Sequence, residues 1–160
     1  MRTKRLAIMF TVLGLLAALT TAAYATSSAK DSTPSLVGTW KMTIPTTGTS
    51  PELTEALQTF FADGNYIETN NNASAGSTAH GVWIGSGNTY LNTFQVFTFD
   101  EQGKYDGKRI IHASIKMDGN DHYTAKFVTD RIDVAGNVTK NIFSGGFEGT
   151  RMEPAMPELQ

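Results

Sequence analysis

Apolar and polar residues alternate with a period of two through most of the chain after residue 35. This alternation puts successive side chains on opposite faces and is typical of strands with one buried face. Breaks rich in Gly, Asn and Asp separate the alternating segments and favour tight turns. We expect eight strands, at 36–44, 58–61, 65–69, 80–84, 89–99, 108–117, 122–133 and 138–151, with a short helical turn at 52–57.

Short turns between nearly all of these segments indicate antiparallel strands that follow one another as a meander. Parallel α/β folds are excluded, because no helical segment is long enough for a crossover between parallel strands. A meander of eight strands must bury one face and protect two sheet edges, and closure into a barrel does both. We therefore expect an all-β, eight-stranded antiparallel up-and-down β-barrel. A two-sheet sandwich is the alternative, but its crossovers need longer connections.

The first 25 residues have the features of a secretory signal peptide. Three basic residues lie within the first five, an apolar run covers 6–23, and Ala23 and Ala25 flank Tyr24 as in a cleavage site. A single membrane anchor is the alternative, since the apolar run is near the lower length limit for spanning. We expect export with cleavage, to a secreted or periplasmic location and without stable membrane insertion afterwards.

The rest of the chain divides into a flexible lead at 26–34, the barrel domain at 35–152 and an irregular tail at 153–160. Without its first 25 residues the chain has ten basic and 15 acidic residues, a formal net charge of −5. This charge gives no electrostatic reason to bind nucleic acid or anionic lipid. The chain has no cysteine, which excludes disulfides and a cysteine nucleophile, so packing must stabilise the fold.

Two short motifs resemble those of a known family. Gly38-Thr39-Trp40 on the first expected strand resembles the G-x-W signature of lipocalins and other calycins, and Gly149-Thr150-Arg151 ends the last strand. Together with the meander, they make the chain similar to small, secreted bacterial lipocalin-like proteins. The resemblance implies a cup-shaped barrel that binds a small apolar ligand, with Trp40 closing one end and Arg151 packed across it. Calycin-like barrels also serve as inhibitors, cyclases and isomerases.

Two-residue turns at 119–120 and 136–137 would divide the last four strands into two faces. The more apolar face, which we take as the interior, holds Tyr90, Asn92, Phe94, Val96, Ile111, Ala113, Ile115, Met117, Val128, Phe143 and Phe147. The other holds Gln95, Phe97, Phe99, Ile110, His112, Ser114, Lys116, Tyr123, Phe127, Lys140, Ile142 and Glu148. In this register Asp133 faces Lys140 on the outside. A one-residue bulge would exchange the faces.

Few residues indicate catalysis. His80, His112 and His122 lack the spacing of a metal site, and we expect neither a metal nor a cofactor. In the assumed register Asp130 lies opposite Arg109 on the inner face, where the pair would anchor a ligand carboxylate or close the barrel. For an enzyme, we expect His112 or Asp130 to transfer the proton, with Arg109 and Tyr90 as polarising partners.

Three functional hypotheses follow. The first is an exported barrel that binds a small, largely apolar molecule, with the loop at 70–79 as a lid. Its expected ligand-binding residues are Trp83, Tyr90, Asn92, Phe94, Val96, Ile111, Ile115, Phe143 and Phe147. The second is a barrel cyclase or isomerase that acts on an apolar substrate. The third is an interaction module, or an oligomer contact, that uses the outer aromatic face.

Overall fold

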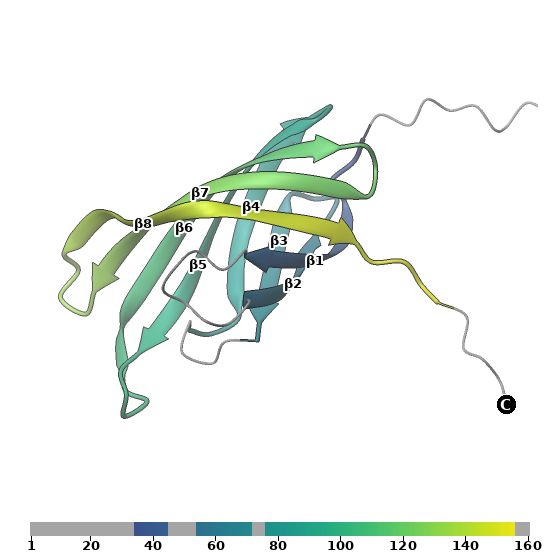
Figure 1. Ribbon diagram of the computed structural model, residues 1–160. Coiled ribbons are helices and arrows are strands. Elements are labelled where there is room, and N and C mark those ends of the chain that lie inside the picture. The colour runs from purple at the N-terminus through teal and green to yellow at the C-terminus, as the bar shows by residue number, and fades with distance from the viewer. Residues whose placement is uncertain (1–33, 45–53, 72–75, 156–160) are drawn as a thin grey trace, which may run out of the picture. The chain divides into compact units, whose positions relative to one another are not determined.

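Eight β-strands form the described part of this protein in the computed structural model (Figure 1). The structure describes residues 34–44, 54–71 and 76–155. They all belong to the second of the two units into which the chain divides, Thr33–Gln160. The predicted signal peptide and all of the predicted lead except residue 34 lie outside the described residues, as do positions 72–75 of the predicted lid.

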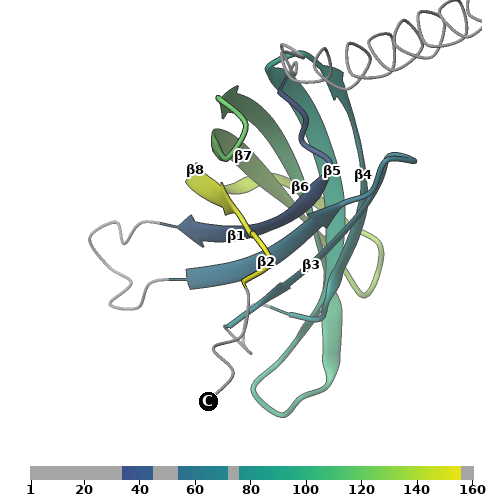
Figure 2. The same cartoon turned by 90° about the vertical axis from the view of Figure 1, so that its right-hand side faces the viewer.

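The strands form a closed antiparallel barrel in chain order, which confirms the predicted fold class. Every strand pairs with its neighbours in sequence, and β1 pairs with β8 to close the sheet around a common interior (Figure 2). Their bounds are β1 Gly38–Ile44, β2 Thr54–Phe60, β3 Asn65–Asn70, β4 Ala79–Ser86, β5 Thr89–Phe99, β6 Tyr105–Asp118, β7 His122–Asp133 and β8 Val138–Arg151. In this described part of the chain, no helix is long and apolar enough to cross a membrane.

Strand β2 corrects the prediction of a helical turn at 52–57, of which positions 54–57 are described. The segment pairs with β1 from Thr54 to Phe60 and alternates between buried Ala56 and exposed Leu57. Its residues favour a helix in isolation, but pairing with strands on both sides outweighs this weak local preference.

The turn between β6 and β7 corrects the predicted inner face. Asp118 pairs with His122, so three residues form the turn instead of two. Met117 therefore faces Tyr123, and both side chains lie inside the barrel. The prediction is wrong for the whole of β7, because one extra turn residue moves every side chain of a strand to the other face. Tyr123 and Phe127 are buried inside, whereas Val128 points outward and is 37% exposed.

The turn between β7 and β8 also differs from the prediction. Ile132 pairs with Val138, and the Asp133 carboxylate accepts a hydrogen bond of 2.9 Å from Asn137 Nδ2. Asp133 therefore does not face Lys140.

A bulge in β8 follows this turn. Arg131 pairs with Thr139 but Thr129 pairs with Phe143, so β8 has two residues more than β7 between these pairs. The first turn shifts the register by one residue and the second by three, because Ile132 instead of residue 135 pairs with Val138. Both shifts are odd, so their effects on the facing of side chains cancel in β8. Phe143 and Phe147 therefore occupy inward positions, as the sequence analysis expects.

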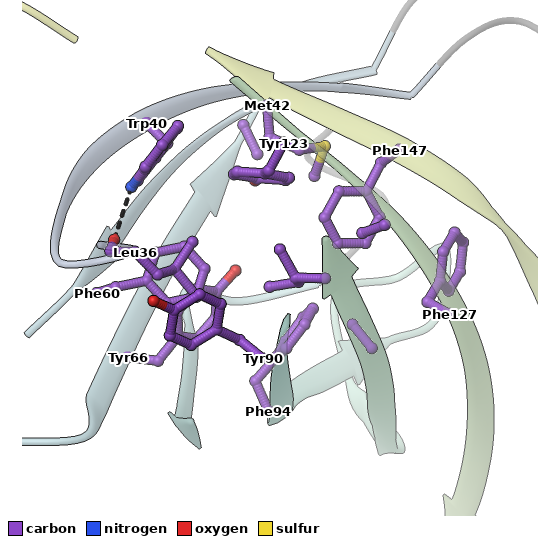
Figure 3. Close-up of a cluster of buried hydrophobic side chains, with 14 of the residues drawn as sticks. Leu36, Trp40, Met42, Phe60, Tyr66, Tyr90, Phe94, Tyr123, Phe127 and Phe147 are labelled. Carbon is purple, nitrogen blue, oxygen red and sulfur yellow. Dashed lines mark hydrogen bonds between the residues drawn. The ribbon is translucent and has the colours of Figure 1, made fainter. Parts of the chain in front are cut away.

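One end of the barrel is closed by the segment 34–37. The Trp40 indole donates a hydrogen bond of 2.9 Å to the Leu36 carbonyl, and neither residue is exposed (Figure 3). The Arg151 guanidinium lies 4.2 Å from the centre of the Trp40 ring and donates to the carbonyls of Ser35 and Val37. This cation–π contact is the one that the resemblance implies.

Candidate interior binding site

The interior of the barrel contains a group of polar side chains from four strands. Gln58 of β2, Tyr66 and Glu68 of β3, Asn92 of β5 and Tyr123 of β7 occupy inward positions, and none is more than 6% exposed. Buried polar groups are costly unless they are hydrogen-bonded, so the partners of each one decide its role.

Glu68 is the centre of a hydrogen-bonded network. Its Oε2 atom accepts a bond of 2.8 Å from Gln58 Nε2 and a short bond of 2.5 Å from the Tyr66 hydroxyl. The Tyr123 hydroxyl in turn donates to Gln58 Oε1. These bonds join side chains of β2, β3 and β7 across the interior.

Burial sets the ionisation of this network. It raises the pKa of the Glu68 carboxyl, an effect that the hydrogen bonds from Tyr66 and Gln58 partly offset. Burial also raises the pKa of the Tyr66 and Tyr123 phenols, and the Glu68 charge adds to both shifts. The phenols therefore remain neutral hydrogen-bond donors, and the Glu68 carboxyl holds its proton more tightly than a carboxyl in water.

Asn92 lies in the same interior but makes no hydrogen bond. Its side chain is inward on β5, between Trp83 of β4 and Ala113 of β6, and is 2% exposed. Neither Oδ1 nor Nδ2 has a hydrogen-bond partner. The amide is near enough to the Tyr66 hydroxyl to lower the pKa of that phenol, but the contact lacks hydrogen-bond geometry.

Aromatic rings surround the polar group. Tyr66 lies between Phe60 and Phe94, with ring centres 4.8 Å and 5.0 Å away. Trp83 contacts Phe60 and Tyr90 at 6.0 Å and 5.6 Å. Figure 3 shows side chains from several strands converging on this interior.

The structure brings most of the predicted ligand-binding residues together. The following line the interior and are buried: Tyr90, Asn92, Phe94, Val96, Ile115 and Phe147. Trp83 and Ile111 are partly buried against them. Phe143 is inward but 58% exposed, and its ring lies 5.6 Å from that of Phe127.

The predicted catalytic residues do not form an interior site. His112 lies on the outer face, where Nδ1 is 3.2 Å from Thr93 Oγ1 and Nε2 is 3.6 Å from Asp130 Oδ2. Asp130 pairs with Ile110 on that outer face, not with Arg109, because the β6–β7 register differs by one residue.

Asp130 is nevertheless buried. Lys140 donates to it at 2.6 Å and the backbone amide of Asn141 at 3.0 Å, and both lie in the β8 bulge. The hydrogen bond from Lys140 lowers the pKa of this carboxyl most. Asp130 thus holds the bulge in place through Lys140 and Asn141, and neither Arg109 nor Tyr90 is among the groups that shift its pKa.

Gln58, Glu68, Tyr66 and Tyr123 are interior residues that the sequence analysis missed. The alternation in 65–70 contained a signal, since Tyr66 and Glu68 have the same parity and only one face of a strand can line the barrel. Tyr123 was assigned outward because of the assumed turn.

Among the described residues, no three His, Asp or Glu side chains are grouped so that they could hold a metal ion. Comparison with protein-family models, with curated proteins and with solved structures finds no match.

Proposed function

We propose that this protein is an exported, lipocalin-like carrier that binds a small, largely apolar molecule inside its barrel. The molecule bears at least one hydrogen-bonding group, which the Asn92 amide meets. The Gly38-Thr39-Trp40 motif and the Arg151 contact support the lipocalin-like assignment, and the aromatic lining supports an apolar ligand.

The unpartnered Asn92 amide carries this proposal. A buried amide without a partner costs about 1–3 kcal/mol of stability. An apolar side chain at this position would avoid that cost, so stability does not explain the amide. A ligand group that hydrogen-bonds to it recovers the cost on binding, and an apolar competitor without such a group does not.

The test begins with the full chain purified from its own host and examined by native mass spectrometry. We expect an apolar molecule to be recovered with it. The recovered molecule, together with the neutral apolar probe phenylnaphthylamine, is then titrated against Asn92→Leu. The control is Gln95→Leu, which also replaces a side-chain amide by leucine but on the outer face of β5.

Asn92→Leu should weaken the binding of the recovered molecule about tenfold or more and leave the affinity for the apolar probe nearly unchanged, because only the recovered molecule hydrogen-bonds to the amide. Gln95→Leu should change neither. The proposal fails if nothing apolar is recovered and the probe does not bind.

A second candidate function is acid–base catalysis by Glu68 on the bound molecule. A carboxyl in an apolar site, with its pKa raised and a tyrosine hydroxyl on one oxygen, is a suitable proton donor and acceptor. This moves the enzyme hypothesis from His112 and Asp130 to the interior. Wild type but not Glu68→Gln should then incorporate solvent deuterium into the recovered molecule, while both bind it.

A further inference from the structure

Two arginines face each other on the inner side of the barrel. Arg109 of β6 pairs directly with Arg131 of β7, and Arg109 also pairs with the buried, inward Val96 of β5. Arg109 is the fifth residue of β6 and Arg131 lies near the end of β7, so both are toward the β5–β6 and β7–β8 turns. Trp40 lies at the opposite end of the barrel, where it pairs with Arg151 at the end of β8.

Only one of the two arginines has a counter-charge. Arg131 Nη2 lies 3.1 Å from Asp106 Oδ2, and Asp106 also accepts a hydrogen bond from Thr98. Among the described residues, Arg109 has neither an ion pair nor a side-chain hydrogen bond, although it is partly buried. The predicted partner of Arg109, Asp130, is on the outer face.

This arrangement is unfavourable without an anion. Like charges directly opposite one another on a sheet destabilise the pairing. Asp106 compensates one guanidinium, which leaves a net positive charge on the inner face. A guanidinium presents a planar fork of donors that matches a carboxylate in a bidentate manner.

Apolar side chains occupy inward positions on β6 and on the nearby strand β8. Ile111 is the next inward residue of β6 and packs against the core. Phe143 of β8 is inward and pairs with Thr129 of β7, which pairs in turn with Ile111. Its ring lies 5.6 Å from that of Phe127, and the residue is 58% exposed. A molecule that reaches Arg109 can therefore bury an apolar body against these side chains.

We propose that the ligand is an anionic amphiphile, a monocarboxylate with an extended apolar body, and that Arg109 binds its carboxylate. This inference rests on the proposed function and adds the charge and the orientation of the ligand. The carboxylate lies toward the β5–β6 and β7–β8 turns, and the apolar body extends toward Asn92.

The test compares dodecanoic acid with its methyl ester, which has the same chain but no charge. Binding is measured by isothermal titration at neutral pH to the wild type and to Arg109→Gln. The matched control is Lys108→Gln, the same loss of charge on the adjacent, outward position of β6. Circular dichroism checks that each variant is folded.

We expect wild type to bind the acid at least tenfold more tightly than the ester. Arg109→Gln should weaken the acid by about ten- to a hundredfold, the usual range for a hydrogen bond to a charged group, and leave the ester unchanged. Lys108→Gln should affect neither. Arg109→Lys keeps the positive charge but loses the planar pair of donors, so its affinity for the acid should lie between those of wild type and Arg109→Gln. It provides a second test if Arg109→Gln does not fold.

The outcomes separate this inference from the proposed function. Equal binding of acid and ester to wild type, or equal effects of Arg109→Gln and Lys108→Gln, overturns the inference but leaves an apolar binding site. If neither compound binds, and native mass spectrometry recovers nothing apolar, the proposed function fails as well.

Discussion

Replacing Asn92 by leucine should stabilise the protein while it weakens ligand binding. Leucine has the same number and branching of side-chain heavy atoms as asparagine but no hydrogen-bonding group. Asn92 is 2% exposed and both of its polar atoms lack partners, so the substitution removes a buried and unsatisfied amide. Most substitutions at buried positions destabilise, which makes the expected sign informative.

The expected size follows from three contributions. Removing the unsatisfied amide contributes about 1–3 kcal/mol, and two added methyl groups contribute about 1.5 kcal/mol. The larger volume of leucine opposes this by about 1–3 kcal/mol through overpacking against Trp83 and Ala113. With each contribution at the middle of its range, the net gain in the free energy of unfolding is about 1.5 kcal/mol. This corresponds to a rise in Tm of roughly 3–8 °C for a domain of this size.

The assay is chemical and thermal unfolding of the ligand-free protein, followed by circular dichroism. Asn92→Val removes the amide, adds less volume than leucine and should also stabilise. Gln58→Met is the matched control with the opposite sign, because the Gln58 amide is bonded to both Glu68 and Tyr123. Its loss leaves the buried Tyr123 hydroxyl without a partner and removes one of the two hydrogen bonds to Glu68, which should cost about 2–4 kcal/mol.

The reasoning is refuted if Asn92→Leu and Asn92→Val are both less stable than wild type with native circular dichroism. The amide would then have a partner in the ligand-free protein, and the cost that a ligand is proposed to recover would not exist.

Three further predictions concern pH and backbone strain. Because its pKa is raised, the buried Glu68 carboxyl stabilises the fold most below the unfolded pKa of about 4.3 and less as pH rises through the folded pKa. The stability of wild type relative to Glu68→Gln, measured by urea unfolding, should therefore fall from pH 4 to neutrality. A constant difference would contradict this. The pKa of Asp130 is lowered, mainly by Lys140, so this carboxylate contributes to stability above the unfolded pKa of about 3.9, and the contribution is lost as pH falls through the folded pKa. Lys140→Met should therefore lower the free energy of unfolding at neutral pH and have little effect in acid. An equal loss at both pH values would refute the assignment. Gly38 has φ +134°, and an added Cβ would lie 2.5 Å from Arg151 Nη1; Gly38→Ala should lower the free energy of unfolding by about 1–3 kcal/mol, and an unchanged Tm would show that neither the strain nor the contact matters.

The barrel itself could be predicted because its signals are local and redundant. Alternation appears in most strands, and the glycine-bearing turns between them require antiparallel neighbours. An error in one strand does not change the number of strands or their order. The 54–60 segment shows this, since its predicted helical turn was wrong and the closed barrel was still correct.

The inner face could not be predicted to the same extent, because it depends on the number of residues in each turn. Gly119-Asn120 and Gly136-Asn137 both look like two-residue turns, but three residues lie between the paired Asp118 and His122, and five between the paired Ile132 and Val138. The sequence pattern of β7 does not distinguish its two faces, since Phe127 and Val128 are both apolar and either could face the interior.

This one-residue difference also changes the electrostatics of the interior. In the predicted register Arg109 faces Asp130 and the inner face is neutral there. In the observed register it faces Arg131, and Asp130 fastens the β8 bulge outside. The predicted pairing of Arg109 with Asp130 would be neutral and favoured a structural role. The observed pairing of Arg109 with Arg131 leaves an excess positive charge on the inner face, which favours an anionic ligand.

The two proposed polar contacts together set a length for the ligand. Asn92 and Val96 are inward residues of the same strand, four positions apart, and Val96 pairs with Arg109. At about 3.3 Å per residue, the two levels of the barrel are separated by about 13 Å. A carboxylate at Arg109 and a hydrogen-bonding group at Asn92 must be separated by a similar distance on the ligand. A long-chain acid with a hydroxyl or carbonyl far from its carboxylate meets this condition, whereas a small aromatic acid can satisfy only one of the two residues. Arg109→Gln and Asn92→Leu should therefore each weaken the long acid, while a small aromatic acid should respond to only one of them.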